Sequence, residues 1–355
     1  MRDLDAPASF AELDTRGMLA SIAELPLQCE DGWIQVQALD LPDGYRSVEQ
    51  IVILGMGGSA IGGDLLRAWL VPECPIPIIV HRDYGLPAFV GERTLVIACS
   101  YSGNTEETLT GFGCAVQSGA RVVSITTGGE LERRTRDRGL PLCLFHYKTQ
   151  PRAALGYSLT FPLGILQRLG LIEDKSADVA EAVAVSRQWQ AEVNESVPLA
   201  ENSAKRLASK LYQRLPVVYG AEHLSEVARR WKGQLNENAK SWAIFDVLPE
   251  LNHNTVAGYS FPADMRQVAY VILLTSQLNH PRVRQRIAIT RELLDQHGLD
   301  CETVEARGSS ALAQVLSAIH YGDYVSYYLA MLHGVDPWSI GGIDFVKRRL
   351  ETSEA

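Results

Sequence analysis

The sequence has no long apolar run, no cysteine pair and no excess of basic residues. No uncharged stretch approaches the roughly 18 to 20 residues that a membrane-spanning helix needs, and MRDLDAPASFAELD lacks the apolar core of a signal peptide. The six cysteines are scattered without a CxxC pair, and Cys99 and Cys143 stand in apolar runs where buried free thiols are expected. We therefore expect a cytoplasmic protein with no disulfide and no membrane partner.

Acidic residues outnumber basic ones by 42 to 33, which gives a formal net charge of -9. A nucleic-acid partner held by general electrostatics needs a basic face, so this balance argues against one. A small anionic substrate is still allowed, because a pocket can be locally positive on an acidic protein. The chain of 355 residues is long enough for two domains, and its 46% apolar content is ordinary for a globular protein.

Short apolar runs alternate with helix-like segments through the first half of the chain. The expected strands are 51–54, 76–80, 94–99, 121–125 and 141–145, and the expected helices are 59–70, 105–118 and 129–138. Continuous apolar strands separated by amphipathic helices are typical of a parallel sheet that is covered on both faces. The first half is therefore expected to be a doubly wound α/β domain.

A weaker pattern of the same kind follows a helical stretch at 163–196. Its expected segments are a strand at 215–220, a helix at 222–240, a strand at 267–275, a helix at 282–298, a short strand at 301–306 and a helix at 310–333. We expect two doubly wound α/β domains, residues 1–160 and 201–355, joined by a helical connection over residues 161–200.

Glycines follow the first expected strand in GMGGSA (residues 55–60), which nearly fits the dinucleotide fingerprint GxGxxG/A. A glycine-rich turn before a helix exposes backbone N–H groups to a phosphate. Under a dinucleotide interpretation, Asp83 is a late candidate for binding the ribose and Arg82 a candidate for binding a 2′-phosphate. A nucleoside-triphosphate loop is excluded, because no Lys-Ser/Thr pair follows the glycines.

Hydroxyl side chains collect after the third expected strand, in SYSGNT (residues 100–105, here the phosphate cup). Ser100, Ser102 and Thr105 can donate hydrogen bonds to a terminal phosphoryl group. Gly103 allows close approach of the backbone, and the next helix adds the partial positive charge of its N-terminus. Ligands of doubly wound sheets bind at the carboxyl ends of the strands, near the switch in strand order. Ordinary N-capping accounts for one of these residues but not for all.

Together, GMGGSAIGGD and SYSGNTEET resemble the sugar isomerase (SIS) domain, in which a serine- and threonine-rich loop binds the phosphate of a phosphosugar. The resemblance implies a flavodoxin-like fold, often present in two copies per chain. It also implies that Gly57, Gly58 and Ser59 approach the sugar end of the ligand. The dinucleotide interpretation then gives way to a phosphosugar.

Three further motifs extend the resemblance over nearly the whole chain. QPRAALGY contains Arg152, RRWKGQLNENAK contains Glu237, and PELNHNTVAGY contains His253. With the two loops, they resemble the bifunctional phosphoglucose/phosphomannose isomerases of the phosphoglucose isomerase superfamily. The resemblance implies an enzyme that interconverts glucose 6-phosphate and fructose 6-phosphate, and also accepts mannose 6-phosphate.

The implied reaction moves a proton between C1 and C2 of the sugar through a cis-enediol. A carboxylate in a partly desolvated site suits the role of base, and Glu237 is the candidate. Arg152 is the candidate for offsetting the charge of the enediolate oxygen, because its guanidinium is always protonated. Cyclic hexose phosphates must also be opened by proton transfer to the ring oxygen, for which a histidine is suited, and His253 is the candidate.

The resemblance further implies that this histidine comes from a neighbouring subunit, so that a homodimer is the functional unit. It also places a lysine near the chain end at the sugar, and IDFVKRRL offers Lys347. No metal and no other cofactor is expected, since His253 has no second histidine at a zinc-like spacing.

Other interpretations stay open beside these. Glu237 can be a solvated surface carboxylate, His253 a loop residue that bonds to the backbone, and Arg152 an ion-pair partner between domains. A non-catalytic phosphosugar regulator, a related amino-sugar phosphate isomerase and, more remotely, a nucleotide-dependent oxidoreductase are the alternative functions. A regulator usually joins one SIS domain to a helix-turn-helix, whereas residues 1–50 are acidic and contain no basic recognition helix.

Overall fold

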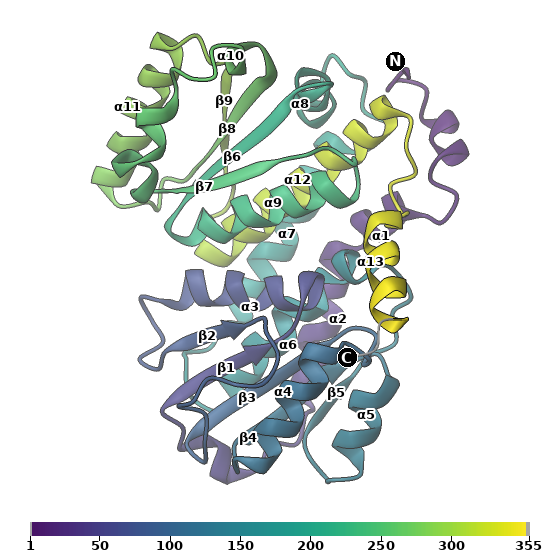
Figure 1. Ribbon diagram of the computed structural model, residues 1–355, viewed down its shortest axis with the longest axis vertical. Helices are drawn as coiled ribbons and strands as arrows, with labels where there is room; N and C mark the ends of the chain where they lie inside the picture. Colours follow the sequence, from purple (N-terminus) through teal and green to yellow (C-terminus); the bar gives the residue numbers. More distant parts are fainter. Residues whose placement is uncertain (1, 353–355) are drawn as a thin grey trace.

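Five parallel strands build the first sheet of the computed structural model, which describes residues 2–352 (Figure 1). The strands are β1 (Gln50–Leu54), β2 (Ile78–His81), β3 (Thr94–Ser100), β4 (Arg121–Thr126) and β5 (Leu142–Leu144). Their order, β2-β1-β3-β4-β5, is that of a doubly wound flavodoxin-like sheet. β1 and β3 are central and almost wholly buried, which explains why their sequences are continuously apolar.

Three helices join these strands and cover the two faces of the sheet. They are α3 (Gly57–Leu70), α4 (Glu106–Gln117) and α5 (Gly129–Arg136). Side chains of β1 alternate between the faces: Val52 packs in a core with Phe112 of α4, whereas Ile51 lies in the core that contains α3. The first half is therefore covered on both sides, as a parallel sheet requires.

The second sheet repeats this arrangement with four parallel strands. They are β6 (Leu215–Ala221), β7 (Ile244–Leu248), β8 (Ala269–Thr275) and β9 (Cys301–Glu305), in the order β7-β6-β8-β9. In both sheets the first strand in the chain pairs with the second on one side and with the third on the other. The predicted α/β class with two doubly wound sheets is confirmed.

Helices lie between and beside the two sheets (Figure 1). The elements are α1 (Met18–Ala23), α2 (Leu25–Gln37), α6 (Leu155–Arg168), α7 (Ser176–Val193), α8 (Ser203–Leu211), α9 (Ser225–Glu237) and α12 (Ala311–His333). α12 packs against α7, α8 and α9, and all of its residues from Leu312 to Leu332 are buried. α3 and α6 of the first half pack on each other, and α3 also contacts α9. α9 therefore lies where the two halves meet.

Smaller elements complete the described residues. They are η1 (Pro7–Glu12), η2 (Asp43–Arg46), η3 (Pro151–Ala153), η4 (Glu222–Leu224), η5 (Glu250–His253), η6 (Thr255–Gly258), α10 (Met265–Val268), α11 (Pro281–Gln296) and α13 (Gly341–Glu351). No helix between residues 2 and 352 is long and apolar enough to cross a membrane. All six cysteines are free thiols.

Among the elements of five residues or more in the second half, three were not expected from the sequence: α8, β7 and α13. β7 is an edge strand, and IFDVL is only half-buried, so it lacks the continuous apolar run of a central strand. The helical connection was expected to start at residue 161, but α6 already begins at Leu155 and packs on α2 and α3. The domain limits at 160 and 200 stay a prediction.

Candidate functional site

The two glycine- and serine-rich loops meet at the carboxyl ends of β1 and β3. These strands are neighbours, and the chain leaves them toward opposite sides of the sheet, which makes this edge the switch point of the strand order. The Ser59 Oγ accepts a hydrogen bond from the Tyr101 backbone N–H at 3.1 Å, so the first loop is tied to the phosphate cup. Arg82, a candidate of the dinucleotide interpretation, instead pairs with the buried carboxylate of Asp64.

Two glycines are required by the contacts that these loops make. A Cβ on Gly58 would lie 2.7 Å from both the backbone N of Arg152 and the carbonyl O of Pro151. Gly103 has φ of 71°, and a Cβ there would lie 1.8 Å from the carbonyl O of Gly128. The first loop is therefore packed directly against the chain segment that carries Arg152.

The hydroxyls of the phosphate cup divide into two groups. Ser100 is buried, and its Oγ lies 2.9 Å from the Thr105 Oγ1. Ser102 is exposed, and its Oγ accepts from the Asn104 backbone N–H at 3.2 Å, a local turn contact. Thr105 is the N-cap of α4 but makes no side-chain capping bond, so its hydroxyl is not used by the helix. Ser100 and Thr105 are the hydroxyls that the structure places together.

Arg152 follows β5 and is held in the contact between the two halves. It lies in η3, is 2% exposed, and its Nη2 donates to the carbonyl oxygens of Pro337 at 2.6 Å and Trp338 at 3.2 Å. Its backbone carbonyl accepts from Arg230 Nη2 at 2.8 Å, and Arg230 is paired with buried Asp323. The residue therefore bridges the first sheet to α9 and α12.

Arg152 and Glu237 form an ion pair. Arg152 Nη1 lies 3.3 Å from Glu237 Oε2, and the Glu237 side chain is 28% exposed, so the pair borders solvent on one side. Burial lowers the pKa of the Arg152 guanidinium, and the Glu237 carboxylate opposes that shift. The structure thus brings together two of the three predicted catalytic residues, although they are far apart in the chain.

His253 and Lys347 are not joined to this pair. Glu237 ends α9 before β7 begins, whereas His253 lies in η5 after β7 ends. The whole of β7, roughly 16 Å long at about 3.3 Å per residue, lies between them in the chain. His253 and Lys347 are both exposed, and within residues 2–352 no hydrogen bond or ion pair links either one to Arg152 or Glu237.

Two neighbours of Glu237 were missed in the sequence. The Asn238 Oδ1 accepts from Arg152 Nε at 2.7 Å. Lys240 has φ of 55°, and its Nζ donates to the carbonyl O of Glu237 at 2.6 Å. Partial burial and then the charge of nearby Arg152 lower the pKa of the Lys240 ammonium to about 8. The only signal for either residue was its place in NENAK beside Glu237.

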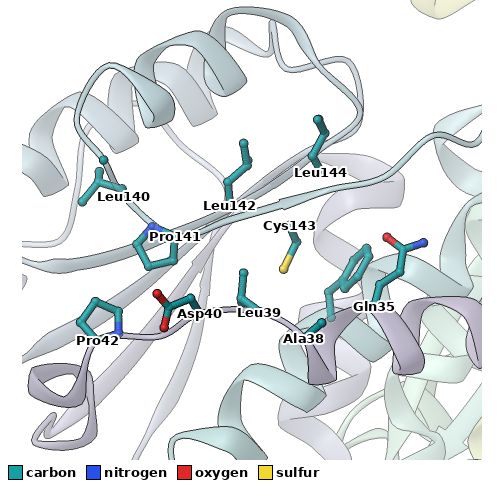
Figure 2. A pocket seen from close by; sticks show the side chains of 12 residues that line it. Gln35, Ala38, Leu39, Asp40, Pro42, Leu140, Pro141, Leu142, Cys143 and Leu144 are labelled. Carbon is teal, nitrogen blue, oxygen red and sulfur yellow. The ribbon is translucent and has the colours of Figure 1, made fainter.

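One groove among the described residues lacks this chemistry. A groove of about 460 Å³ runs between residues 35–42 and the 139–144 segment with β5, and its lining is mostly aliphatic (Figure 2). It contains none of the predicted site residues. Within residues 2–352 no group of three His, Cys, Asp or Glu side chains is placed to hold a metal ion.

Known proteins resemble this chain over nearly its full length. It is 41% identical to a bifunctional phosphoglucose/phosphomannose isomerase of Caldicellulosiruptor bescii, over 94% of this chain and 98% of that protein. A bifunctional phosphoglucose/phosphomannose isomerase of Aquifex aeolicus is 36% identical, over 88% of this chain and 93% of its own. The chain belongs to the bifunctional phosphoglucose/phosphomannose isomerase family. The predicted family is confirmed.

Two further similarities concern the C-terminal half and the fold. Residues 200–350 match the model of the bacterial phospho-glucose isomerase C-terminal SIS domain. The crystal structure of a hypothetical protein from Thermus thermophilus aligns with a TM-score of 0.75 at 19% identity, over 99% of this chain and 96% of that one. At this identity the structural match bears on the fold alone.

Proposed function

We propose that this protein is an aldose–ketose isomerase that interconverts glucose 6-phosphate and fructose 6-phosphate and also accepts mannose 6-phosphate. One observation carries the proposal beyond family membership. Arg152 and Glu237, a fixed cation and a carboxylate, are paired at 3.3 Å beside the loop that contains Gly58 and Ser59. A base and a charge stabiliser beside the loop that contacts the sugar are the groups that the reaction needs.

In the proposed reaction Glu237 removes the proton from C2 or C1 and returns it to the other carbon. Proton removal leaves a cis-enediolate, whose negative charge on oxygen the Arg152 guanidinium offsets, and a proton passes between O1 and O2 as the carbonyl group changes carbon. Ser100 and Thr105 hold the phosphate, and Gly57, Gly58 and Ser59 contact the sugar. Ser102 and Lys347 belong to the proposal as outer contacts, because both are exposed.

Ring opening is assigned to His253 of a second copy of the chain. The separation of His253 from Glu237 by the length of β7 supports this assignment, since one subunit alone does not bring them together. Exposed apolar side chains support a homodimer: Trp242, just before β7, is 80% exposed, and Phe261, after η6, is 83% exposed. A cytoplasmic location and independence from metal and other cofactors are further predictions.

The proposal is tested by turnover of each substrate and by the loss of the base. Purified protein is incubated separately with glucose 6-phosphate, fructose 6-phosphate and mannose 6-phosphate, and the products are followed by coupled assay. The Glu237→Gln variant keeps the shape of the side chain but cannot accept the proton. We expect its kcat to fall by about 10³-fold or more, which is at least about 4 kcal/mol of transition-state stabilisation, with phosphosugar binding retained.

Glu292→Gln on the exposed face of α11 is the matched control and should turn over like wild type. Normal turnover by Glu237→Gln would remove Glu237 from the mechanism. Phosphosugar binding by wild type without any turnover would instead favour the regulator, and turnover of amino-sugar phosphates alone would favour the amino-sugar isomerase.

A further inference from the structure

Each of the three nitrogens of the Arg152 guanidinium has its own hydrogen-bond partners. Its Nε donates to Asn238 Oδ1 at 2.7 Å, and its Nη2 donates to the carbonyl oxygens of Pro337 and Trp338. Its Nη1 faces Glu237 Oε2 at 3.3 Å. Arginine has five N–H donors, one on Nε and two on each Nη. One N–H of Nη1 therefore has no partner within residues 2–352, and it is on the nitrogen that faces Glu237.

Asn238 is the residue that can fix this orientation. It is 0% exposed and is the C-cap of α9, directly after Glu237. Its backbone N–H donates to the Gln234 carbonyl at 2.8 Å, and its Nδ2 donates to Ser326 Oγ of α12 at 3.0 Å. The amide oxygen faces Arg152 Nε, an N–H donor that can bond only to the oxygen end of the amide. The end of α9 thus both carries the Glu237 carboxylate and holds the Arg152 guanidinium through Asn238.

We propose that Asn238 is a positioning residue that fixes the rotation of the Arg152 guanidinium and keeps one Nη1 hydrogen free for the substrate oxygen. The inference rests on the proposed function. The guanidinium is a rigid planar group, and its two carbonyl contacts at Nη2 hold it from one side only. The bond at Nε adds a second anchor on another edge of the group, so that Nη1 is held in one place between them. A misplacement of about 1 Å can lower the rate of a positioned reaction on the order of 10²-fold.

The Asn238→Ala variant tests this role by steady-state kinetics. We expect kcat to fall by about 10- to 100-fold. KM should change by less than about threefold, because the phosphate is held by Ser100 and Thr105 in the first half and not by α9. Asn238→Asp, which keeps an oxygen for Arg152 Nε, should have a kcat several-fold above that of Asn238→Ala. If Asn238→Ala does not fold, Asn238→Ser, which is too short to reach Nε, replaces it.

Ser326→Ala is the control for a merely structural effect. It removes the other hydrogen bond of the Asn238 side chain but leaves the Oδ1–Nε contact, so its kcat should stay within about threefold of wild type even if its melting temperature falls. If kcat falls in proportion to the melting temperature in both Asn238→Ala and Ser326→Ala, Asn238 only stabilises the fold. The same holds if Asn238→Asp is as slow as Asn238→Ala while it stays folded.

A double-mutant cycle with Arg152→Lys identifies the group through which Asn238 acts. Lysine has no Nε–H for Asn238 to hold, so Asn238→Ala should lower kcat by less than about threefold in that background. A full loss in the Arg152→Lys background would overturn the inference. Wild-type kinetics distinguish a failure of this inference from a failure of the proposed function. An inactive wild type rejects the function, whereas an active wild type and an Asn238→Ala variant of unchanged kcat reject only this inference.

Discussion

Ser100 and Thr105 show how the structure narrows a motif to the side chains that matter. Both hydroxyls belong to the phosphate cup, and their oxygens lie 2.9 Å apart, whereas the Ser102 oxygen is engaged by the Asn104 backbone. Two adjacent hydroxyls beside the N-terminus of α4 can both donate to one phosphoryl group. The pair is therefore expected to carry most of the phosphate binding, with the exposed Ser102 hydroxyl as a further donor.

We predict that Ser100→Ala and Thr105→Ala each raise KM for hexose phosphate by about tenfold, with kcat within about threefold of wild type. Hydrogen bonds to a charged group contribute about 1.5–3 kcal/mol, and about 1.4 kcal/mol corresponds to a factor of ten. Thr110→Ala, on the exposed part of α4, is the matched control and should leave KM unchanged. A fall in kcat without a rise in KM would place the phosphate elsewhere.

Arg152 and Glu237 could be predicted from the sequence as candidates, but Asn238 could not. Each of the first two stands in its own recognisable motif. Asn238 looks like any polar residue at a helix end, and its role depends on Arg152 and Ser326, each more than 80 residues away in the chain. Such long-range contacts leave no periodic signal in one sequence.

Helix α3 contacts both the segment that carries Arg152 and the helix that carries Glu237. It begins at Gly57, directly after the first loop, and Gly58 lies against the Pro151–Arg152 backbone. α3 also contacts α9, which ends at Glu237. One helix start therefore positions both the loop that meets the sugar and the segment that carries the cation.

We predict that Gly58→Ala lowers both stability and kcat. The added Cβ would meet backbone atoms at 2.7 Å, which cannot move aside as a flexible side chain can, so η3 must shift and carry Arg152 with it. Overpacking of this kind costs about 1–3 kcal/mol. The free energy of unfolding from urea titration and kcat from the coupled assay are the two measurements.

Gly113→Ala on α4 is the matched control, because a Cβ there meets nothing within 4 Å. Alanine in a helix interior is favoured over glycine by about 0.5–1 kcal/mol, so this variant should be slightly more stable and fully active. If Gly58→Ala behaves in the same way, the close packing of the first loop on η3 is not needed for the site.

Elements with a strong burial pattern were the easiest to predict, although the less buried edge strands β2 and β9 were also expected. β1 and β3 are buried on both faces and were expected from their apolar runs, whereas the half-buried edge strand β7 was not. α13 was also missed, and its exposed apolar residues Ile343, Val346 and Leu350 have a helical spacing. Their exposure agrees with a surface that another copy of the chain covers.

A single copy of the chain brings together only two of the three proposed catalytic residues. Arg152 and Glu237 meet between the two sheets, while His253 lies at the opposite end of β7 and is exposed. A site that borrows His253 from a second copy needs a symmetric arrangement, in which each chain completes the other's site. Activity measurements on mixed dimers can therefore test whether two copies of the chain share the site.

We predict that Glu237→Gln and His253→Asn, each inactive alone, recover activity when they are co-refolded in equal amounts. Half of the dimers are then mixed, and each mixed dimer has one site with an intact Glu237 from one chain and an intact His253 from the other. The expected activity is about a quarter of wild type, since half of the sites in half of the dimers are complete. Native mass spectrometry, with an affinity tag on one variant, checks that mixed dimers form. An inactive mixture of well-formed mixed dimers would show that His253 acts within its own subunit, because only a borrowed histidine allows two inactive chains to make an active one.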